Sequence, residues 1–475
     1  MPPTLWYNRN SLRKNRIHQG HATADYVVSP RPTRSEVNEL KAQPQPAPAP
    51  TVTPLSYEPP MPRSIAESGL NIGFLSDLVL KVLYFEGYLS GSQIAERIRL
   101  PFGGIVDQVL EFLKREQLTE VKGQGGFGEQ AYQYAITLKG REKAHEALDR
   151  SHYVGAAPVT LDAYQKAMHR QSLKDFTVHQ RAMRQGLAHL VINERTFGQI
   201  GPAVNSARSI FLYGPPGNGK TAIAESVGRL ILAENIYVPH AVEVDGQVIK
   251  VFDSVNHQRA GEGNGQSRGR NIDPRWAHIR RPVIITGGEL TLETLDLVWD
   301  EVNKYYEAPF QMKANGGLFL IDDFGRQQVR PRDLLNRWIL PLEKRVDYLT
   351  LHTGRKIEIP FDVLIVFSTN LAPKDLVDEA FLRRIRHKIE IGDPSFEEYR
   401  EIFKRVCQHK SVPYDDRALA YLLQEWYIKP RRKMRAVHPR DLIDQLVDIA
   451  RYMNAQPVLS KDLIDRACEA YFVEI

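Results

Sequence analysis

The stretch from Ser209 to Asn235 decides the fold. It reads Ser-Ile-Phe-Leu-Tyr (209–213), then Gly-Pro-Pro-Gly-Asn-Gly-Lys-Thr (214–221), then Ala-Ile-Ala-Glu-Ser-Val-Gly-Arg-Leu-Ile-Leu-Ala-Glu-Asn (222–235). The first part is a short apolar run typical of a buried strand, and the last part repeats apolar residues at helical spacing. The glycine-rich segment therefore joins a strand to a helix, and from Arg208 onward we expect alternating strands and helices with a parallel α/β sheet.

That loop has the spacing G-x-x-x-x-G-K-T, which is the chemistry of a phosphate site. Glycines let backbone N–H groups surround phosphate oxygens, and the N-terminus of the following helix adds partial positive charge. Lys220 would neutralise the β- and γ-phosphates of ATP, and the Thr221 hydroxyl would ligate Mg²⁺. The residues expected to contact the nucleotide are Gly214, Pro215, Pro216, Gly217, Asn218, Gly219, Lys220, Thr221 and Ala222.

A second apolar run, Leu318–Ile321, ends in two acids, Asp322 and Asp323. We expect this strand to place both carboxylates beside the phosphate loop. Asp322 would hold Mg²⁺ together with Thr221, and Asp323 would polarise the attacking water. ATP and Mg²⁺ are therefore the predicted ligands, and ATP hydrolysis is the predicted reaction.

These motifs resemble those of the AAA+ ATPase family over roughly residues 170–475. The resemblance implies that the strand 363–369 ends at a sensor, Asn370, which contacts the γ-phosphate or orients the water. It also implies a ring, hexameric by analogy. One departure is that the family usually has Asp-Glu where this chain has Asp322-Asp323, so a shorter side chain would hold the water, which affects the hydrolysis rate more than nucleotide binding.

The same resemblance assigns roles at the ATP site to arginines in two basic segments. The segment 378–386 is similar to the one that supplies an arginine finger to a neighbouring subunit, and Arg383, Arg384 and Arg386 remain alternatives for that role. Arg440, in the segment 437–442, would reach the nucleotide from a small α-helical lid. A solvated basic surface is the plain alternative for both segments.

Two further segments narrow the branch of the family. The segment 314–319 is similar to that of bacterial enhancer-binding activators and magnesium chelatase subunits, and 346–360 reads as a β-hairpin in the position of their pre-sensor-1 insertion, which often faces the ring pore. The Gly-rich basic insertion 257–276 would be a mobile functional loop. The sequence lacks a threading-type pore loop and a GAFTGA-type loop, which argues against transcription activation by that route.

The N-terminal part divides into a tail and a small domain. The first 65 residues hold 12 of the 30 prolines and carry eight basic against four acidic residues, so residues 1–70 are predicted to be a disordered, basic tether. A docking segment that uses Trp6 and Tyr7 is the alternative. Residues 71–155 read as three helices, a hairpin and a closing helix, which resembles an α+β winged helix-turn-helix domain.

Charge favours a protein partner for this domain. It holds 10 basic and 11 acidic residues, and its expected recognition helix exposes Asp107, Glu111 and Glu116. DNA readers need a basic surface to neutralise phosphates. The prediction is therefore a ring-forming, chaperone-like remodelling ATPase that contacts a protein through this domain and the tail. A DNA-binding ATPase and a nucleotide-gated scaffold that barely hydrolyses ATP are the alternatives.

Composition sets the remaining limits. The 475 residues carry a net charge of +6, with 42% hydrophobic residues, and no apolar run approaches the length of a membrane span. Two cysteines, Cys407 and Cys468, cannot build a disulfide framework or a zinc site, which fits a cytoplasmic protein. The predicted divisions are the tail 1–70, the winged helix 71–155, a linker 156–200, the α/β core 201–394 and the α-helical lid 395–475.

Overall fold

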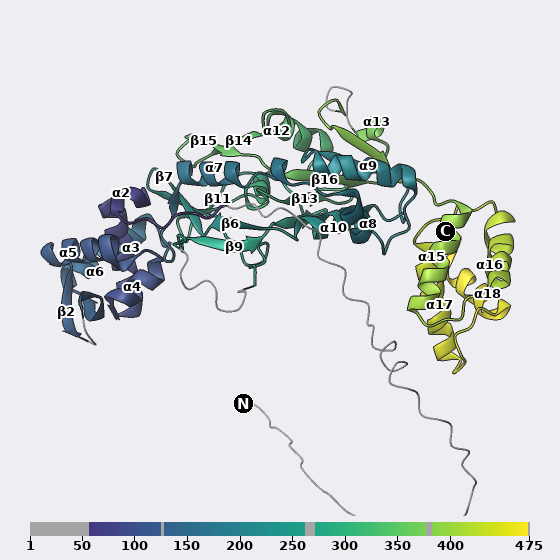
Figure 1. Ribbon diagram of the computed structural model, residues 1–475, viewed down its shortest axis with the longest axis horizontal. Coiled ribbons are helices and arrows are strands. Elements are labelled where there is room, and N and C mark those ends of the chain that lie inside the picture. The colour runs from purple at the N-terminus through teal and green to yellow at the C-terminus, as the bar shows by residue number, and fades with distance from the viewer. Residues whose placement is uncertain (1–56, 125–127, 262–270, 377–381, 474–475) are drawn as a thin grey trace, which may run out of the picture. The chain divides into compact units, whose positions relative to one another are not determined.

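The computed structural model describes residues 57–124, 128–261, 271–376 and 382–473 (Figure 1). Most of the predicted tail lies outside these ranges, as do residues 262–270 of the Gly-rich insertion. Residues 57–70 are more ordered than a tether. Pro60 forms a β-bridge with Ile272, and the short helix α2 (Ile65–Ser68) is capped by the Ser64 side chain.

The central sheet has five parallel strands, which confirms the expected α/β core. Their order across the sheet is β10 (Val283–Thr286), β13 (Leu318–Ile321), β16 (Leu364–Thr369), β5 (Ile210–Tyr213) and β17 (His387–Glu390). Strands β13 and β16 are buried along their whole length, as expected for a parallel sheet covered on both faces. Strand β16 therefore lies between the strand of the phosphate loop and the strand that ends in Asp322.

Alternate side chains of these strands enter two different cores. Ile210, Leu212 and Leu320 pack with helices α8 (Gln180–Gly186), α9 (Glu194–Asn205) and α10 (Lys220–Ile231). Phe211, Phe319 and Phe367 pack on the opposite face with Trp338 of α12 (Pro331–Lys344). Short helices α11 (Phe310–Lys313) and α13 (Pro373–Leu376) precede β13 and follow β16. Because strand residues alternate between faces, the same strands contribute side chains to both cores, one on each face of the sheet.

The chain also forms a second five-stranded sheet, which the expected alternation of strands and helices did not include. Its strands, in order, are β11 (Val298–Asp300), β12 (Tyr305–Glu307), β8 (Gln247–Lys250), β7 (Ala241–Val244) and β4 (Val159–Thr160). The antiparallel pair β6 (Asn235–Pro239) and β9 (Trp276–Arg280) shares its hydrophobic core. Thus most of the strands between α10 and β13 belong to this layer, and of the described ones only β10 joins the parallel sheet.

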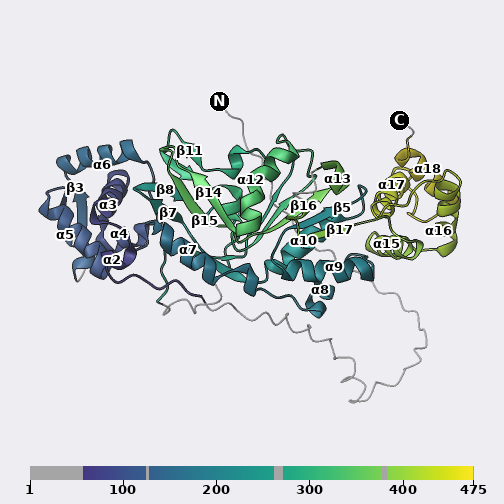
Figure 2. The same cartoon turned by 90° about the horizontal axis from the view of Figure 1, so that it is seen from above.

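The predicted linker is also part of this layer. Strand β4 pairs with β7, and helix α7 (Leu161–Arg170) lies along β7 and β15 (Lys356–Pro360) (Figure 2). The buried Tyr164 hydroxyl accepts a hydrogen bond of 2.7 Å from Asn315. Residues 156–200 are therefore packed structure and not a spacer, because their apolar side chains complete the cores on both sheets.

The hairpin predicted for 346–360 is present as β14 (Val346–Thr350) and β15 (Lys356–Pro360). Its turn is held inside the same chain, since Arg355 forms an ion pair with Asp245. On its outer strand, the Gln165 side chain donates to the Glu358 carbonyl at 2.7 Å. Tyr348 and Thr350 on one strand and Lys356 and Glu358 on the other remain exposed.

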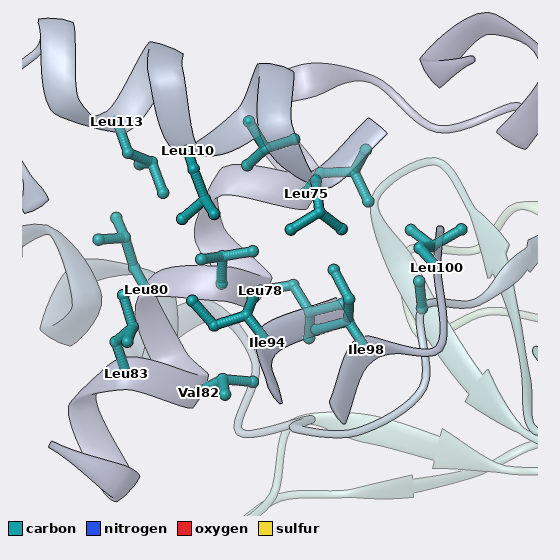
Figure 3. Packing of buried hydrophobic residues seen from close by; sticks show 14 of the residues in the cluster. Leu75, Leu78, Leu80, Val82, Leu83, Ile94, Ile98, Leu100, Leu110 and Leu113 are labelled. Carbon is teal, nitrogen blue, oxygen red and sulfur yellow. The ribbon is translucent and has the colours of Figure 1, made fainter. Parts of the chain in front are cut away.

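The N-terminal domain contains the predicted helices α3 (Ile72–Glu86), α4 (Gly91–Ile98), α5 (Asp107–Arg115) and α6 (Leu138–Arg150). Its hairpin, β2 (Thr119–Gln124) and β3 (Tyr132–Ile136), gains a third strand, β1 (Tyr88–Ser90). Leucines and isoleucines of α3, α4 and α5 interlock in one core (Figure 3). A kinked segment, η1 (Phe102–Val106), whose backbone is non-helical at Gly103 and Gly104, leads into α5.

The C-terminal residues form helices α15 (Phe396–His409), α16 (Asp416–Leu423), α17 (His438–Tyr452) and α18 (Lys461–Tyr471), with a π-helical turn, η5 (Gln424–Ile428). They share a core of their own that includes Tyr399, Leu419, Leu446 and both buried cysteines. In the described part of the chain, no helix combines the length and apolarity needed to cross a membrane.

Candidate nucleotide site

The phosphate loop leads into α10, whose N-terminus has no side-chain cap. Helices α9 and α15, by contrast, are capped by Asn193 and Ser395. The first N–H groups of any helix lack partners inside the helix, so this end can bind an anion. Two glycines shape the loop. Gly214 has φ of 136° with Ile391 O 2.3 Å from where a Cβ would sit, and Gly217 has φ of 79° with Val437 Cγ1 at 2.7 Å.

Lys220, the first residue of α10, points back across the loop. Its ammonium donates to Gly214 O at 3.0 Å, to Pro215 O at 2.9 Å and to Asn370 Oδ1 at 2.7 Å. Burial lowers the pKa of Lys220, and the nearby carboxylates of Asp322 and Asp323 oppose that shift. The loop thus holds the cation at the helix N-terminus, where phosphate oxygens would gather.

Asn370 joins the loop to the acidic strand. Its Oδ1 accepts from Lys220, and its Nδ2 donates to Asp323 Oδ1 at 3.1 Å. The strand order explains this placement, because β16 ends between β5 and β13 and delivers Asn370 to the gap between them. Asp323 has φ of 47°, a conformation that aspartate tolerates, and its side chain is exposed. Lys220 at the start of α10 and two polar side chains that follow the ends of β16 and β13 therefore form one row.

Thr221 and Asp322 form a second pair beside this row. The Thr221 hydroxyl donates to the Asp322 carboxylate. It lies 2.9 Å from Oδ2 and 3.1 Å from Oδ1. Hydroxyl and carboxylate oxygens are the donors that Mg²⁺ prefers, usually with waters completing the shell. The two residues expected to hold the ion are thus together and have suitable chemistry for it.

Both polar atoms of the Asn218 side-chain amide form hydrogen bonds within the protein. Its Nδ2 donates to Asp393 Oδ1 at 2.8 Å, and its Oδ1 accepts from Ala436 N at 3.1 Å. Asp393 also pairs with Arg435, and Val437 N donates to Gly217 O at 2.8 Å. No sequence pattern predicted these contacts between the phosphate loop and residues 393–437. We call these four hydrogen-bonded or paired contacts the loop latch.

A cavity of about 320 Å³ adjoins the loop. Ala222 and Arg440, both predicted to contact nucleotide, line it, and Arg440 also pairs with Asp441 at 2.9 Å. Most of its wall is apolar: Leu190, Val191, Ile192, Ile223, Ile402, Val406 and Val437. An apolar wall of this size suits a flat base. The sequence-based prediction missed Leu190 to Ile192, although an apolar run before the Asn193 cap could have identified them.

The three candidate finger arginines lie just before β17. Arg383 and Arg386 are exposed, and Arg384 pairs with Glu343 at 2.7 Å. Within the described ranges, no hydrogen bond or ion pair joins any of the three to Lys220, Asp322 or Asp323. Residues 378–381 of the same predicted segment lie outside the described ranges. The structure therefore keeps all three arginines apart from the site of their own chain.

Comparison with known proteins adds little to this geometry. A model for a domain of unknown function (DUF8689) matches residues 395–470, which hold helices α15 to α18. A search of curated proteins returned no significant match.

Three of the solved structures with some similarity to this chain are two of NtrX and one of RuvB. NtrX from Brucella abortus in complex with ADP has 15% identity and a TM-score of 0.36, over 69% of this chain and 65% of that chain. NtrX in complex with ATP has 14% identity and a TM-score of 0.34, over 78% and 65%. A RuvB variant from Thermotoga maritima has 14% identity and a TM-score of 0.33, over 64% and 74%. This chain therefore spans 65% of the length of either NtrX chain, and likeness at this level carries no conclusion about function.

Proposed function

We propose that this chain is a P-loop ATPase of the AAA+ type, which binds ATP with Mg²⁺ and hydrolyses it. The observation that supports the proposal most strongly is the row Lys220–Asn370–Asp323, which lies beside the uncapped N-terminus of α10. If Lys220 and Asp323 formed only a structural ion pair, the Asn370 amide would not be needed between their charges. A site for phosphoryl transfer needs a cation for the phosphate, a polar sensor and an acid for water in this order.

Each part of the site has a separate task. The N–H groups of α10 and Lys220 would bind the phosphates, and the apolar cavity would take the base beside Ala222. Thr221 and Asp322 would hold Mg²⁺, which when bound polarises phosphate oxygens. Asp323 would accept a hydrogen bond from the attacking water, and Asn370 would fix the Asp323 carboxylate through their 3.1 Å contact.

Assembly and partner form the second part of the proposal. An arginine among Arg383, Arg384 and Arg386 would complete the site of a neighbouring subunit, which requires a homo-oligomeric ring, expected to be a hexamer. The α-helical lid, residues 395–475, would move with the nucleotide through the loop latch. The N-terminal domain would contact a protein partner, because its 11 acidic residues balance its 10 basic ones, and Glu111 of α5 accompanies Lys114 and Arg115, whereas a DNA reader needs a basic surface.

The experiment compares wild type with Lys220→Ala and with the matched control Lys344→Ala, an exposed lysine at the end of α12. We expect Lys220→Ala to lose fluorescent-ATP binding and phosphate release by about a hundredfold or more, because a preorganised cation at the phosphates is removed. The control should match wild type. Full turnover in Lys220→Ala would exclude this site as the ATPase centre.

Ring formation has its own measurement. Phosphate release per chain should rise with protein concentration if a neighbouring arginine completes the site. A rate per chain that stays constant from dilute to concentrated protein, with a monomeric mass throughout, would contradict the proposed assembly while leaving ATP hydrolysis in place.

A further inference from the structure

A second hollow, of about 500 Å³, lies on the C-terminal helices, and the phosphate site does not account for it. Three short segments form it: the entry to α15, the end of α16 with η5, and the turn before α17. The residues that line it are Asp393, Pro394, Phe396, Leu423, Tyr427, Ile428, Arg431, Arg432, Lys433 and Met434.

The hollow presents bulky apolar side chains to solvent. Phe396 is 50% exposed and Ile428 is 63% exposed, while Leu423 and Tyr427 are buried. Grouped apolar exposure of this kind is more typical of a binding surface than of a solvated helix end. The position of Phe396 is notable because Ser395 and Glu398 form a capping box there, so the helix start needs no apolar residue facing water.

The charges around it are unbalanced. Arg431 and Lys433 are exposed, and in the described part of the chain neither side chain makes a hydrogen bond or an ion pair. Arg432 is already engaged, since it donates to Trp426 O at 2.7 Å and lies 3.7 Å from the Phe472 ring centroid. Asp393, the acid among the described lining residues, is neutralised by Arg435.

We propose that this hollow docks an acidic peptide segment of a partner protein. A bulky apolar side chain of the peptide would pack between Phe396 and Ile428, and flanking carboxylates would pair with Arg431 and Lys433. The combination of apolar walls with two unpaired cations favours this ligand over nucleic acid. A phosphate backbone would use the cations alone and leave the apolar side chains without partners.

The hollow also connects to the phosphate loop. Asp393 lines it and accepts the 2.8 Å hydrogen bond from Asn218. A peptide beside Asp393 and the 431–434 turn would therefore bias the loop latch, and docking should change ATP turnover. This second consequence rests on the proposed ATPase function, whereas peptide binding does not.

The test measures fluorescence anisotropy of a fluorescein-labelled peptide of repeating Glu-Glu-Leu-Phe against the full chain. Two comparison peptides replace Glu by Lys, or Leu and Phe by Ser, and a labelled DNA duplex forms a fourth arm. The variants are Arg431→Glu and Ile428→Ser. Their matched controls are Arg417→Glu on α16 and Tyr452→Ser on α17, exposed positions of the C-terminal helices outside the hollow.

We expect the acidic apolar peptide to bind best and each hollow variant to weaken it about tenfold, because reversing a charge adds repulsion to the lost ion pair. The controls should bind like wild type. Absence of saturable binding, equal binding of the Lys peptide, unchanged affinity of both hollow variants, or tighter binding of the duplex would each overturn the proposal. Lys220→Ala separates the two proposals, since it should lose ATP binding and keep peptide binding.

Discussion

The parallel sheet and the second sheet use polar side chains in opposite ways. Around the second sheet, charged groups satisfy one another: Lys313 pairs with Asp253 at 3.0 Å and with Glu307 at 3.4 Å, and buried Arg275 pairs with Asp273 at 2.8 Å. At the ends of the parallel strands, the polar groups instead converge on an uncapped helix N-terminus. The difference teaches that the direction in which polar groups point, and not their number, separates a site from a scaffold.

The largest expected effect comes from removing the water-orienting acid at the parallel sheet. Asp323→Asn should reduce ATP turnover about a hundredfold while ATP binding stays near wild type, because general-base or water-positioning groups contribute to the transition state. Turnover under saturating ATP and binding of fluorescent ATP provide the two measurements. The control is Asp333→Asn, at an exposed carboxylate in the first turn of α12. Unchanged turnover would remove Asp323 from the chemistry.

The second effect tests whether the second sheet is a scaffold. Asp273→Asn leaves buried Arg275, which also donates to Ser68 O and Pro158 O, without its counter-charge. Such a change should lower the free energy of unfolding by about 3 kcal/mol. Asp245→Asn removes only the exposed partner of Arg355 and should cost about 0.5 kcal/mol. Urea titration measures both, and equal losses would contradict the scaffold interpretation.

A smaller effect concerns the loop latch. Asn218→Ala removes both side-chain hydrogen bonds to Asp393 and Ala436, so the apolar cavity loses a fixed wall. ATP affinity should fall about fivefold, as for loss of hydrogen bonds worth about 1 kcal/mol. The melting temperature of the nucleotide-free protein should change little. A wild-type affinity for ATP would show that Asn218 does not position the lid segment.

The smallest effect is a pH dependence within the second sheet. Burial opposes ionisation of Asp253, but hydrogen bonds from Val255 N–H, Lys313 and Asn256 outweigh it and lower the pKa of Asp253 to about 2. The group therefore stabilises the fold above its unfolded pKa of about 4, and that stability disappears as the pH falls towards 2.

The test compares melting temperatures of wild type and Asp253→Asn from neutral pH down to about pH 2. The gap between them should be largest at neutral pH and close as the solution becomes acidic. Asp448→Asn, at an exposed carboxylate on α17, provides the control. A gap that widens in acid would contradict the assignment.

Sequence reasoning identified the parts of the site that depend on local pattern. Four parts could be recognised from patterns about ten residues long, because apolar runs and glycines act locally. They are the phosphate loop, the strand before Asp322, the strand before Asn370 and the hairpin 346–360. Asn370 entered the prediction only through the resemblance to the AAA+ family, and its hydrogen bonds to both Lys220 and Asp323 were not predicted.

The rest depends on contacts between distant segments. Strand β4 is short and can be recognised as a strand only from its pairing with β7. Leu190 to Ile192 form a cavity wall only together with Ile402 and Val406, which are distant in the sequence. The second sheet was missed because its strands are short and interrupted by loops, so no window shows a clear period. Nothing in the local sequence around Asn218 indicates that Asp393 and Ala436 will take both ends of its amide.

The pairing of β4 with β7 has a consequence for dissecting the molecule into working pieces. Residues 156–200 supply an edge strand to one sheet and helical cover to the other. A fragment that begins at residue 201, where the motif-bearing region starts, would lose both and expose apolar surface on two faces. A cut that respects the architecture falls before Val159, and even there it severs the carbonyl of Pro158 from the guanidinium of Arg275. The half of this protein that carries the phosphate-loop motif therefore includes residues that no motif marks.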